Sequence, residues 1–260
     1  MRIAVLLKEV PDTYSDREMN LETGLTDRSG DVVADEVSER AVEAALRIAE
    51  AAGDSAQVGV EILSVGPESS ADSVRRGIAM GASEAYVVSD DALVGADVTL
   101  TAQVLAKLVE KQGYDLVVAG GMSSDGAAGV VAPFVAELLG WPVLTNLTEL
   151  SIDGDSVRAT QASETATAEL SAQLPAVVSV ADGFADPRYP NFKGLMAAKK
   201  KELNTVSLAE LGVDPEDFTH PRAIMVDIER RPERERGEII DGNSTAATRL
   251  VDFLESKNLI

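Results

Sequence analysis

The chain has 260 residues and a formal net charge of −21, an acidic balance that disfavours binding to nucleic acid phosphates or to an anionic membrane surface. It has no cysteine and a single histidine, His220, which excludes disulfides, thiolate catalysis, cysteine-ligated iron–sulfur clusters and histidine-based metal sites or triads. No apolar run approaches the ~20 residues of a membrane-spanning helix, and the apolar segment before Lys8 is too short for a signal peptide, so we expect a cytoplasmic protein.

Strands and helices are predicted to alternate along the first half of the chain. Buried strands are expected at residues 2–7, 57–65, 84–88 and 115–119, and helices at residues 36–52, 70–80, 97–111 and 127–139. The polar stretch 12–35 is longer than a usual connection, so it is either a functional loop or a small hairpin. Four strand-and-helix units in a row predict an α/β fold with a doubly wound, mostly parallel sheet.

The pattern changes after Trp141 and Pro142. Residues 143–150, 156–160 and 168–174 predict antiparallel or edge strands, and residues 176–180 predict another buried strand. A loop over 182–190, a short helix over 194–201, a brief strand at 205–206 and a capped helix from Ser207 should follow. The charge-rich segment 227–238 and an amphipathic helix over 244–256 end the chain. We therefore expect an α/β domain over 1–200 and a C-terminal extension over 201–260, too poor in apolar residues to fold alone.

A glycine-rich turn follows the strand predicted at 115–119. It runs from Gly120 to Gly129 and leads towards the helix predicted at 127–139. In open parallel sheets ligands bind at the carboxyl ends of the strands, and free N–H groups at a helix start can hold a phosphate. Alternatively, the glycines serve only tight turns and close packing, because the pattern is neither a Walker A loop nor a GxGxxG fingerprint.

Catalytic groups are not recognisable in the sequence. No carboxylate lies in a motif with a nucleophile, a base and an orienting group, and His220 beside Pro221 is expected to be a surface residue. The loop over 187–192 carries an aromatic pair between prolines and is followed by three lysines. This loop serves either protein docking or ordinary packing, and the spacing does not decide between them.

Four stretches, in this order and spacing, carry a resemblance to a known family. They are residues 2–12; residues 39–47; residues 66–67 with 79–82; and residues 174–178 leading to 187–190 and 196–201. With these stretches the chain resembles the β subunit of electron-transfer flavoproteins, a family that includes nitrogen-fixation-associated homologues. The resemblance implies an adenine-nucleotide α-hydrolase-like fold and a non-catalytic electron carrier. It further implies a heterodimer with an α subunit that shares FAD, and AMP or a second FAD in the β subunit's own site. Electrons would arrive from acyl-CoA and related dehydrogenases and leave to a quinone oxidoreductase.

The resemblance also assigns cofactor-binding positions. The nucleotide site would use Leu6, Asp35, Glu36, Val37, Ser38, Val65, Gly120, Met122, Ser123, Ser124, Asp125, Gly126, Ala127, Ala128, Gly129, Val130 and Val131. The chain departs from the family pattern where relatives commonly carry Thr or Asn and Gln, because it has Ala128, Gly129 and Val130 there. Phosphate contacts would then come mainly from backbone N–H groups, helped by Ser123 or Ser124. Thr13 and Tyr14 would contact the isoalloxazine ring of the flavin.

The family's recognition loop for dehydrogenases corresponds to residues 184–201 of the domain. Its docking residues would be Arg188, Tyr189, Phe192, Leu195 and Met196, with Phe192 as the anchor. The extension over 201–260 would pack on the partner subunit. Two other interpretations stay open: a stand-alone adenine-nucleotide binding or hydrolysing module of the same fold, and a structural subunit without its own nucleotide.

Overall fold

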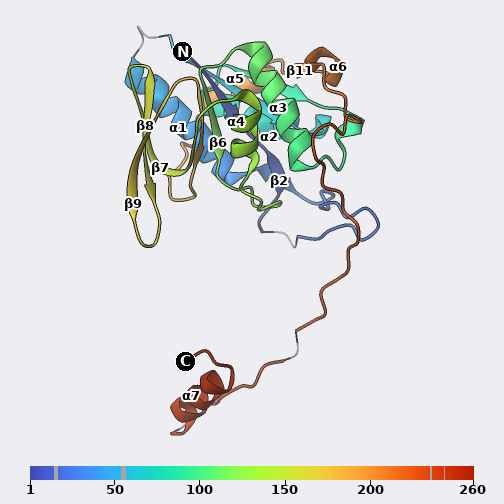
Figure 1. Ribbon diagram of the computed structural model, residues 1–260, viewed down its shortest axis with the longest axis vertical. Coiled ribbons are helices and arrows are strands. Elements are labelled where there is room, and N and C mark those ends of the chain that lie inside the picture. Colours follow the sequence, from blue (N-terminus) through green and yellow to red (C-terminus); the bar gives the residue numbers. More distant parts are fainter. Residues whose placement is uncertain (15–16, 54–56, 235, 243) are drawn as a thin grey trace. The chain divides into compact units, whose positions relative to one another are not determined.

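A computed structural model describes residues 1–14, 17–53, 57–234, 236–242 and 244–260 (Figure 1). The chain forms two compact units, Met1–Val226 and Asp227–Ile260, and each is described by itself. The first unit contains the sheet and all the positions assigned to the cofactors and to docking.

The first unit is built on a nine-stranded sheet with the order β11-β5-β4-β1-β6-β10-β7-β8-β9. The six strands from β11 to β10 and the start of β7 pair in parallel, whereas β7, β8 and β9 pair antiparallel. The strands are β1 (Arg2–Leu6), β4 (Gly59–Val65), β5 (Glu84–Val88), β6 (Leu116–Gly120), β7 (Val143–Asp153), β8 (Ser156–Ala162), β9 (Thr167–Gln173), β10 (Ala176–Val180) and β11 (Asn204–Val206). The predicted doubly wound, mostly parallel sheet is confirmed.

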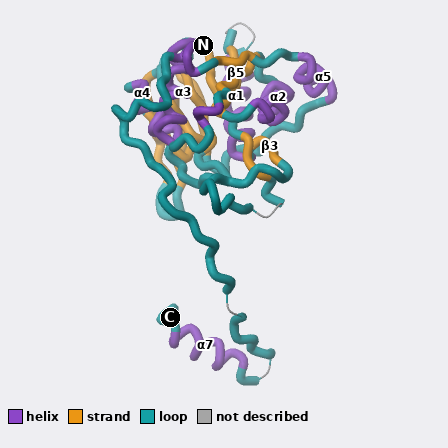
Figure 2. Tube along the Cα trace, turned by 90° about the vertical axis from the view of Figure 1, so that its right-hand side faces the viewer, coloured by secondary structure: helices purple, strands orange, loops and turns teal. Residues whose placement is uncertain are grey.

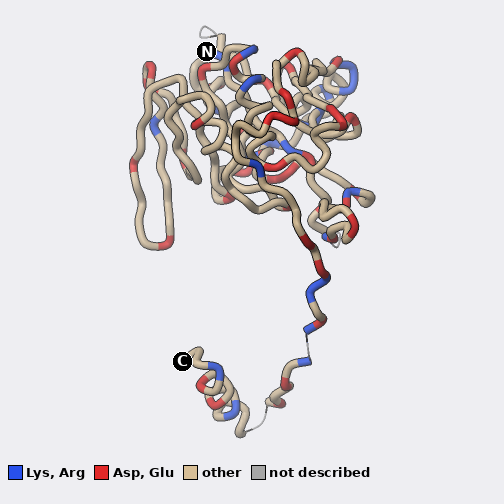
Figure 3. Tube along the Cα trace, turned by 45° about the vertical axis from the view of Figure 1, so that its right-hand side comes forward, with Lys and Arg blue, Asp and Glu red and all other residues tan. Residues whose placement is uncertain are grey.

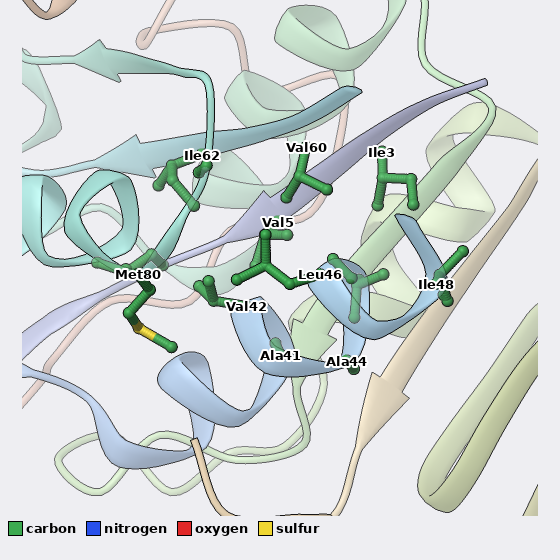
Figure 4. Close-up of a cluster of buried hydrophobic side chains, with 14 of the residues drawn as sticks. Ile3, Val5, Ala41, Val42, Ala44, Leu46, Ile48, Val60, Ile62 and Met80 are labelled. Carbon is green, nitrogen blue, oxygen red and sulfur yellow. The ribbon is translucent and has the colours of Figure 1, made fainter. Parts of the chain in front are cut away.

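Helices cover both faces of this sheet, which gives the unit two apolar layers (Figure 2). The helices are α1 (Glu36–Ala52), α2 (Ala71–Met80), α3 (Val98–Gln112), α4 (Val131–Leu139), α5 (Phe192–Lys200) and α6 (Leu208–Leu211), with short 3-10 turns at Glu68–Ser70 and Asp91–Leu93. Strand β1 shows why two layers form: Ile3 and Val5 pack with α1 and α2, while Ala4 and Leu6 pack with α3 and α4. Figure 4 shows the first layer, in which Val42 of α1 lies close to Val5.

Capping residues fix several helix ends where the sequence predicts them. The Asp97 carboxylate accepts from the Leu100 N–H at the start of α3, and Gly81 ends α2 with φ of 139°. Helix α4 is different, because it begins at Val131 and not at residue 127. Positive φ values of 48° at Ala127 and 67° at Gly129 break the helical path before that point.

The long polar stretch 12–35 is for the most part the connection between two short paired strands, the first of which precedes it. Strands β2 (Glu9–Pro11) and β3 (Val32–Ala34) pair antiparallel outside the main sheet. The intervening residues 12–31, of which 12–14 and 17–31 are described, are called the insert below. Within the insert, Met19 and Thr26 form an isolated antiparallel β-bridge.

The first compact unit extends past residue 200 as far as Val226. Strand β11 pairs with β5, and Val206, Leu208 and Leu211 are buried against the layer that contains α3. These apolar side chains hold residues 201–226 in the first unit.

The second unit consists of a charged segment and one helix, α7 (Ala246–Ser256). Charges of both signs alternate along the segment that leads to α7 (Figure 3). No residue of α7 is buried, although its sequence is amphipathic and carries Leu250 and Phe253. Among the described helices of the whole chain, none combines the length and apolar character needed to cross a bilayer.

Candidate functional site

The strand order reverses at β1, which lies between β4 on one side and β6 on the other. The chain proceeds from β1 to β4 and β5 in one direction, and later from β6 to β10 in the other. The carboxyl ends of β1 and β6 are Leu6 and Gly120. In doubly wound folds a ligand binds beside such a reversal, so the loop after Gly120 is in the expected position for a binding site.

Two glycines allow the start of this loop to approach its neighbours closely. A Cβ atom on Gly120 would lie 2.9 Å from the carbonyl carbon of Val37 at the start of α1. A Cβ atom on Gly121 would lie 2.9 Å from the carbonyl oxygen of Val180, to which the Gly121 N–H donates at 2.8 Å. Glycine is therefore required at both positions for steric reasons, and the loop is held against α1 and β10.

A buried carboxylate joins the start of α1 to the same loop. Asp35 is the N-cap of α1, and its Oδ2 accepts from the Ser38 N–H at 3.4 Å and from the Ser38 hydroxyl at 3.3 Å. Its Oδ1 accepts from the Ser124 N–H at 3.0 Å. Asp35 therefore positions the loop and is not available as a ligand for a phosphate.

Free backbone donors gather at the start of α4. In the described part of the chain, the N–H groups from Ala128 to Ala132 have no acceptor within hydrogen-bonding distance, and Pro133 follows within the first helical turn. The buried Ser124 hydroxyl is likewise without a partner among the described residues. The helix dipole adds positive potential at this end. An anionic group of phosphate size matches this set of donors.

Asp125 lies in the middle of the loop with its side chain only 2% exposed. Its carboxylate is paired with Lys8 at 2.7 Å and with Arg28 of the insert at 2.6 Å. Burial alone would raise the pKa of Asp125, but the hydrogen bonds and charge of Lys8, with help from Ser123 and Arg28, hold it far below its ordinary value. The carboxylate therefore stays ionised and neutralised beside the free N–H groups.

The remaining positions assigned to cofactors lie at the same edge of the sheet or on the insert. Leu6 is buried at the end of β1, and Val65 is half-buried at the end of β4. Glu36 and Met122 are exposed, as are Gly126, Ala127, Ala128 and Gly129, whereas Val130 and Val131 are half-buried. Thr13 and Tyr14 are exposed, and the Tyr14 side chain is 99% exposed.

The docking positions form an exposed apolar surface on α5 and the turn before it. Asn191 caps α5 by accepting from the Gly194 N–H at 2.8 Å. Phe192 is 78% exposed, and the spacing of the helical residues places Leu195 and Met196 on the same face. Tyr189 is 90% exposed, and its ring lies 5.5 Å from the Arg76 guanidinium. We call these four residues, Tyr189, Phe192, Leu195 and Met196, the docking patch.

Arg188, in contrast, is bound to the chain itself. Its Nε donates to Glu43 of α1 at 2.8 Å, and its Nη1 pairs with Glu50 of the same helix. Its backbone N–H also donates to Glu43, at 3.1 Å. The hydrogen bonds that Arg188 donates to Glu50 and Glu43 raise the pKa of Arg188 above its ordinary value. Arg188 therefore holds the turn that presents the docking patch.

Three residues of this region were not predicted from the sequence. Lys8 and Arg28 reach Asp125 from segments 117 and 97 residues away in the sequence. Asn146 of β7 adopts φ of 54° and donates its backbone N–H to the Ser179 hydroxyl at 3.1 Å, next to Gly121. Such contacts depend on the tertiary structure and leave no local signal in the sequence.

Comparison with known proteins agrees with this architecture. Residues 23–211 match the electron transfer flavoprotein domain. The chain is 37% identical to the electron transfer flavoprotein subunit beta of Mycobacterium tuberculosis and 39% identical to that of Mycobacterium leprae, with 99% of each chain covered. It is 32% identical to the electron transfer flavoprotein subunit beta of Bacillus subtilis over 99% of this chain and 98% of the relative. The chain therefore belongs to the electron transfer flavoprotein family, as a member of its β-subunit branch.

Proposed function

We propose that this chain is the β subunit of a cytoplasmic, heterodimeric electron-transfer flavoprotein that shares FAD with an α subunit. The observation that carries the proposal is the loop at the strand reversal, with free N–H groups from Ala128 to Ala132, in a chain of this family. Bound FAD supplies an isoalloxazine ring that accepts and releases electrons. The protein itself binds, orients and docks, and is not a catalyst by itself.

The chain's own nucleotide site would hold AMP or a second FAD through its phosphate. The N–H groups at the start of α4 would donate to the phosphate oxygens, and the unpaired Ser124 hydroxyl would add a side-chain donor. Leu6 and Val65, at the ends of neighbouring strands, would line the same edge of the sheet. Because backbone donors do most of the binding, the absence of Thr, Asn or Gln at residues 128–130 is compatible with the site.

The shared flavin would be contacted from this chain by Thr13 and Tyr14. Tyr14 fits this role because an aromatic ring that is 99% exposed on the insert is free to stack on a planar ring of another group. The C-terminal extension would contribute to the same heterodimer. The exposed apolar residues Leu250, Val251 and Phe253 of α7 are expected to pack on the α subunit.

The docking patch would receive the electron donor, an acyl-CoA or related dehydrogenase, and a quinone oxidoreductase would then accept the electrons. Phe192 suits the role of an anchor, because it is large, apolar and 78% exposed on a capped helix. Lys193, Lys199 and Lys200 are exposed on the same helix and would favour a partner with an acidic rim.

The nucleotide content of the purified heterodimer tests the proposed site. The protein is denatured, and the released nucleotides are separated and counted against the protein concentration. We expect FAD shared between the subunits together with about one AMP or one further FAD per heterodimer. If neither AMP nor a second FAD is recovered, the proposed nucleotide site is wrong.

The substitution Phe192→Ala tests the docking patch. We expect unchanged flavin content and slower electron acceptance from the dehydrogenase, because the variant removes only the exposed anchor. Phe218→Ala is the matched control, since Phe218 is also exposed, at 70%, but lies outside the patch. Equal transfer kinetics for the wild type and Phe192→Ala would reject this role.

A stand-alone nucleotide-binding or hydrolysing module is the second candidate function. It is favoured by one observation: this chain by itself offers several donors, the N–H groups from Ala128 to Ala132 and the Ser124 hydroxyl, at the candidate phosphate site. Purification from the native host distinguishes the two candidates. A second subunit that co-purifies, with the absorption spectrum of a flavin, supports the electron carrier, whereas a colourless single chain that hydrolyses ATP supports the module.

A further inference from the structure

The geometry points to Asp125 as a positioning residue that fixes the nucleotide loop by holding Lys8 and Arg28. In this arrangement the two cations beside the candidate phosphate site do not bind the phosphate but brace the loop that does. The inference rests on the proposed nucleotide site. It assigns a role to the salt-bridge cluster of Lys8, Arg28 and Asp125, which the proposed cofactor contacts do not explain.

The carboxylate of Asp125 is fully used by the protein. Its Oδ1 accepts from Lys8 Nζ at 2.7 Å and from the Gly126 N–H at 2.6 Å, while its Oδ2 accepts from Arg28 Nη2 at 2.6 Å. The side chain is 2% exposed, whereas those of Lys8 and Arg28 are 44% and 34% exposed. A carboxylate so deeply buried is stable only with such partners, so its removal leaves both cations without their buried counter-charge.

The two cations come from different segments, and each is fixed by a further contact. Lys8 follows β1, and its carbonyl oxygen accepts from the Asp35 N–H at 2.9 Å. Arg28 belongs to the insert, and its Nη1 donates to the Glu9 carbonyl at 3.0 Å. Asp125 therefore joins the end of β1, the insert and the nucleotide loop at one point.

The residue next to Asp125 is held on both sides as well. The Ser124 N–H is bound by Asp35 at 3.0 Å, and the Ser124 carbonyl accepts from Arg17 of the insert. The free N–H groups begin only three residues after Asp125, at Ala128. Fixing residues 124 and 125 therefore orients the backbone from which those donors project.

The charge balance of the cluster explains why an acidic residue is compatible with an anion site. One carboxylate and two cations leave a net charge of about +1, which attracts a phosphate, while Asp125 is neutralised locally. If Lys8 and Arg28 were phosphate ligands instead, Asp125 would compete with the phosphate for them. The two roles predict opposite effects of removing the charge of Asp125.

The test compares Asp125→Asn with the wild type in the full-length chain, purified with its partner subunit and stripped of bound nucleotide. AMP is the probe, and its dissociation constant is measured by calorimetry. We expect the variant to bind AMP about tenfold more weakly, because the donors lose their fixed orientation. Equal or tighter binding would overturn the inference and assign Lys8 and Arg28 to the phosphate. Asp153→Asn is the matched control, because Asp153 pairs with Arg158 at 2.7 Å on the surface.

Hydrogen exchange provides a second measurement that does not depend on AMP binding. In Asp125→Asn we expect faster exchange in peptides covering residues 17–34 and 120–130, and no change in Asp153→Asn. If the wild type binds no AMP, the proposed nucleotide site fails, yet unchanged exchange would still overturn the role of Asp125. If Asp125→Asn does not fold, Arg28→Gln replaces it, because it keeps the buried carboxylate paired with Lys8. We then expect the same loss of protection in nucleotide-free protein, and unchanged exchange would overturn the inference.

Discussion

Replacement of Glu43 by Gln tests how the turn that presents the docking patch is held. The Glu43 side chain is 5% exposed and accepts from Arg188 and from Arg47, the latter at 2.7 Å. Burial would raise its pKa, but these hydrogen bonds, with the charge of Arg188, lower it from 4.5 to about 2. The folded state therefore favours the ionised form of Glu43 more strongly than the unfolded chain does.

The expected magnitude follows from this pKa. A group whose pKa is depressed on folding stabilises the protein fully above its unfolded pKa, here 4.5, and loses that contribution as the pH falls towards about 2. The difference between the two pKa values corresponds to about 3 kcal/mol at pH 7, and to about 2 kcal/mol at pH 3.5. Glu43→Gln, which cannot ionise, should therefore show a stability deficit that shrinks by about 1 kcal/mol between these pH values.

The assay is urea unfolding of both proteins, followed by circular dichroism at pH 7 and at pH 3.5. Glu50→Gln is the control, because Glu50 contacts the same arginine but is 61% exposed, so its pair with Arg188 should contribute less than about 1 kcal/mol. A deficit of Glu43→Gln that stays constant with pH would refute the reasoning, because ionised Glu43 would then not be the stabilising species.

Substitutions at three further positions test close contacts and backbone strain. Gly194→Ala should destabilise the protein by about 1 to 3 kcal/mol, because the new Cβ would overlap the Ala79 carbonyl oxygen at the end of α2. An unchanged melting temperature would contradict this prediction. Gly120→Ala should destabilise the protein by a similar amount and also weaken AMP binding measured by calorimetry, since its Cβ would lie 2.9 Å from the carbonyl carbon of Val37. Normal AMP affinity would show that the loop adjusts to the added Cβ. Asn146→Ala should lower the free energy of unfolding by about 1 kcal/mol, and Asn146→Gly should lower it clearly less, because residue 146 has a φ of 54°. Equal losses in thermal unfolding would exclude backbone strain as the cause.

The parts of the fold that the sequence predicts are those with local signals. Helix α1 begins and ends at the predicted residues because Asp35 caps it and an apolar face repeats along it. The sequence predicts the start of α4 four residues too early, at residue 127 instead of Val131, because alanines favour a helix while the positive φ of Ala127 depends on the loop around it. The attachment of residues 201–226 to the first unit has no local signal, because it depends on the pairing of the short strand β11 with β5, a strand distant in sequence.

The candidate site divides in the same way. The glycine-rich loop at the end of β6 could be found from its pattern, since a run of small residues between a strand and a helix is visible in the sequence. The partners of Asp125 and Arg188 could not be found, because ion pairs between segments 97 to 145 residues apart depend on how the strands are ordered. The resemblance assigns Arg188 to docking, and the structure adds that its guanidinium is paired with Glu43 and Glu50 of α1.

The way the loop presents its donors also explains which of its positions are constrained. In the proposed site a phosphate would be bound by N–H groups from Ala128 to Ala132, so the side chains at these positions could be small and apolar. The constrained positions are instead those that shape the backbone of the loop. Gly120 and Gly121 allow close approach to neighbouring segments, and Asp35 and Asp125 hold the loop through hydrogen bonds and ion pairs. Backbone donors recognise a phosphate but not what it is attached to, so the choice between AMP and a second FAD must be made by groups outside this loop.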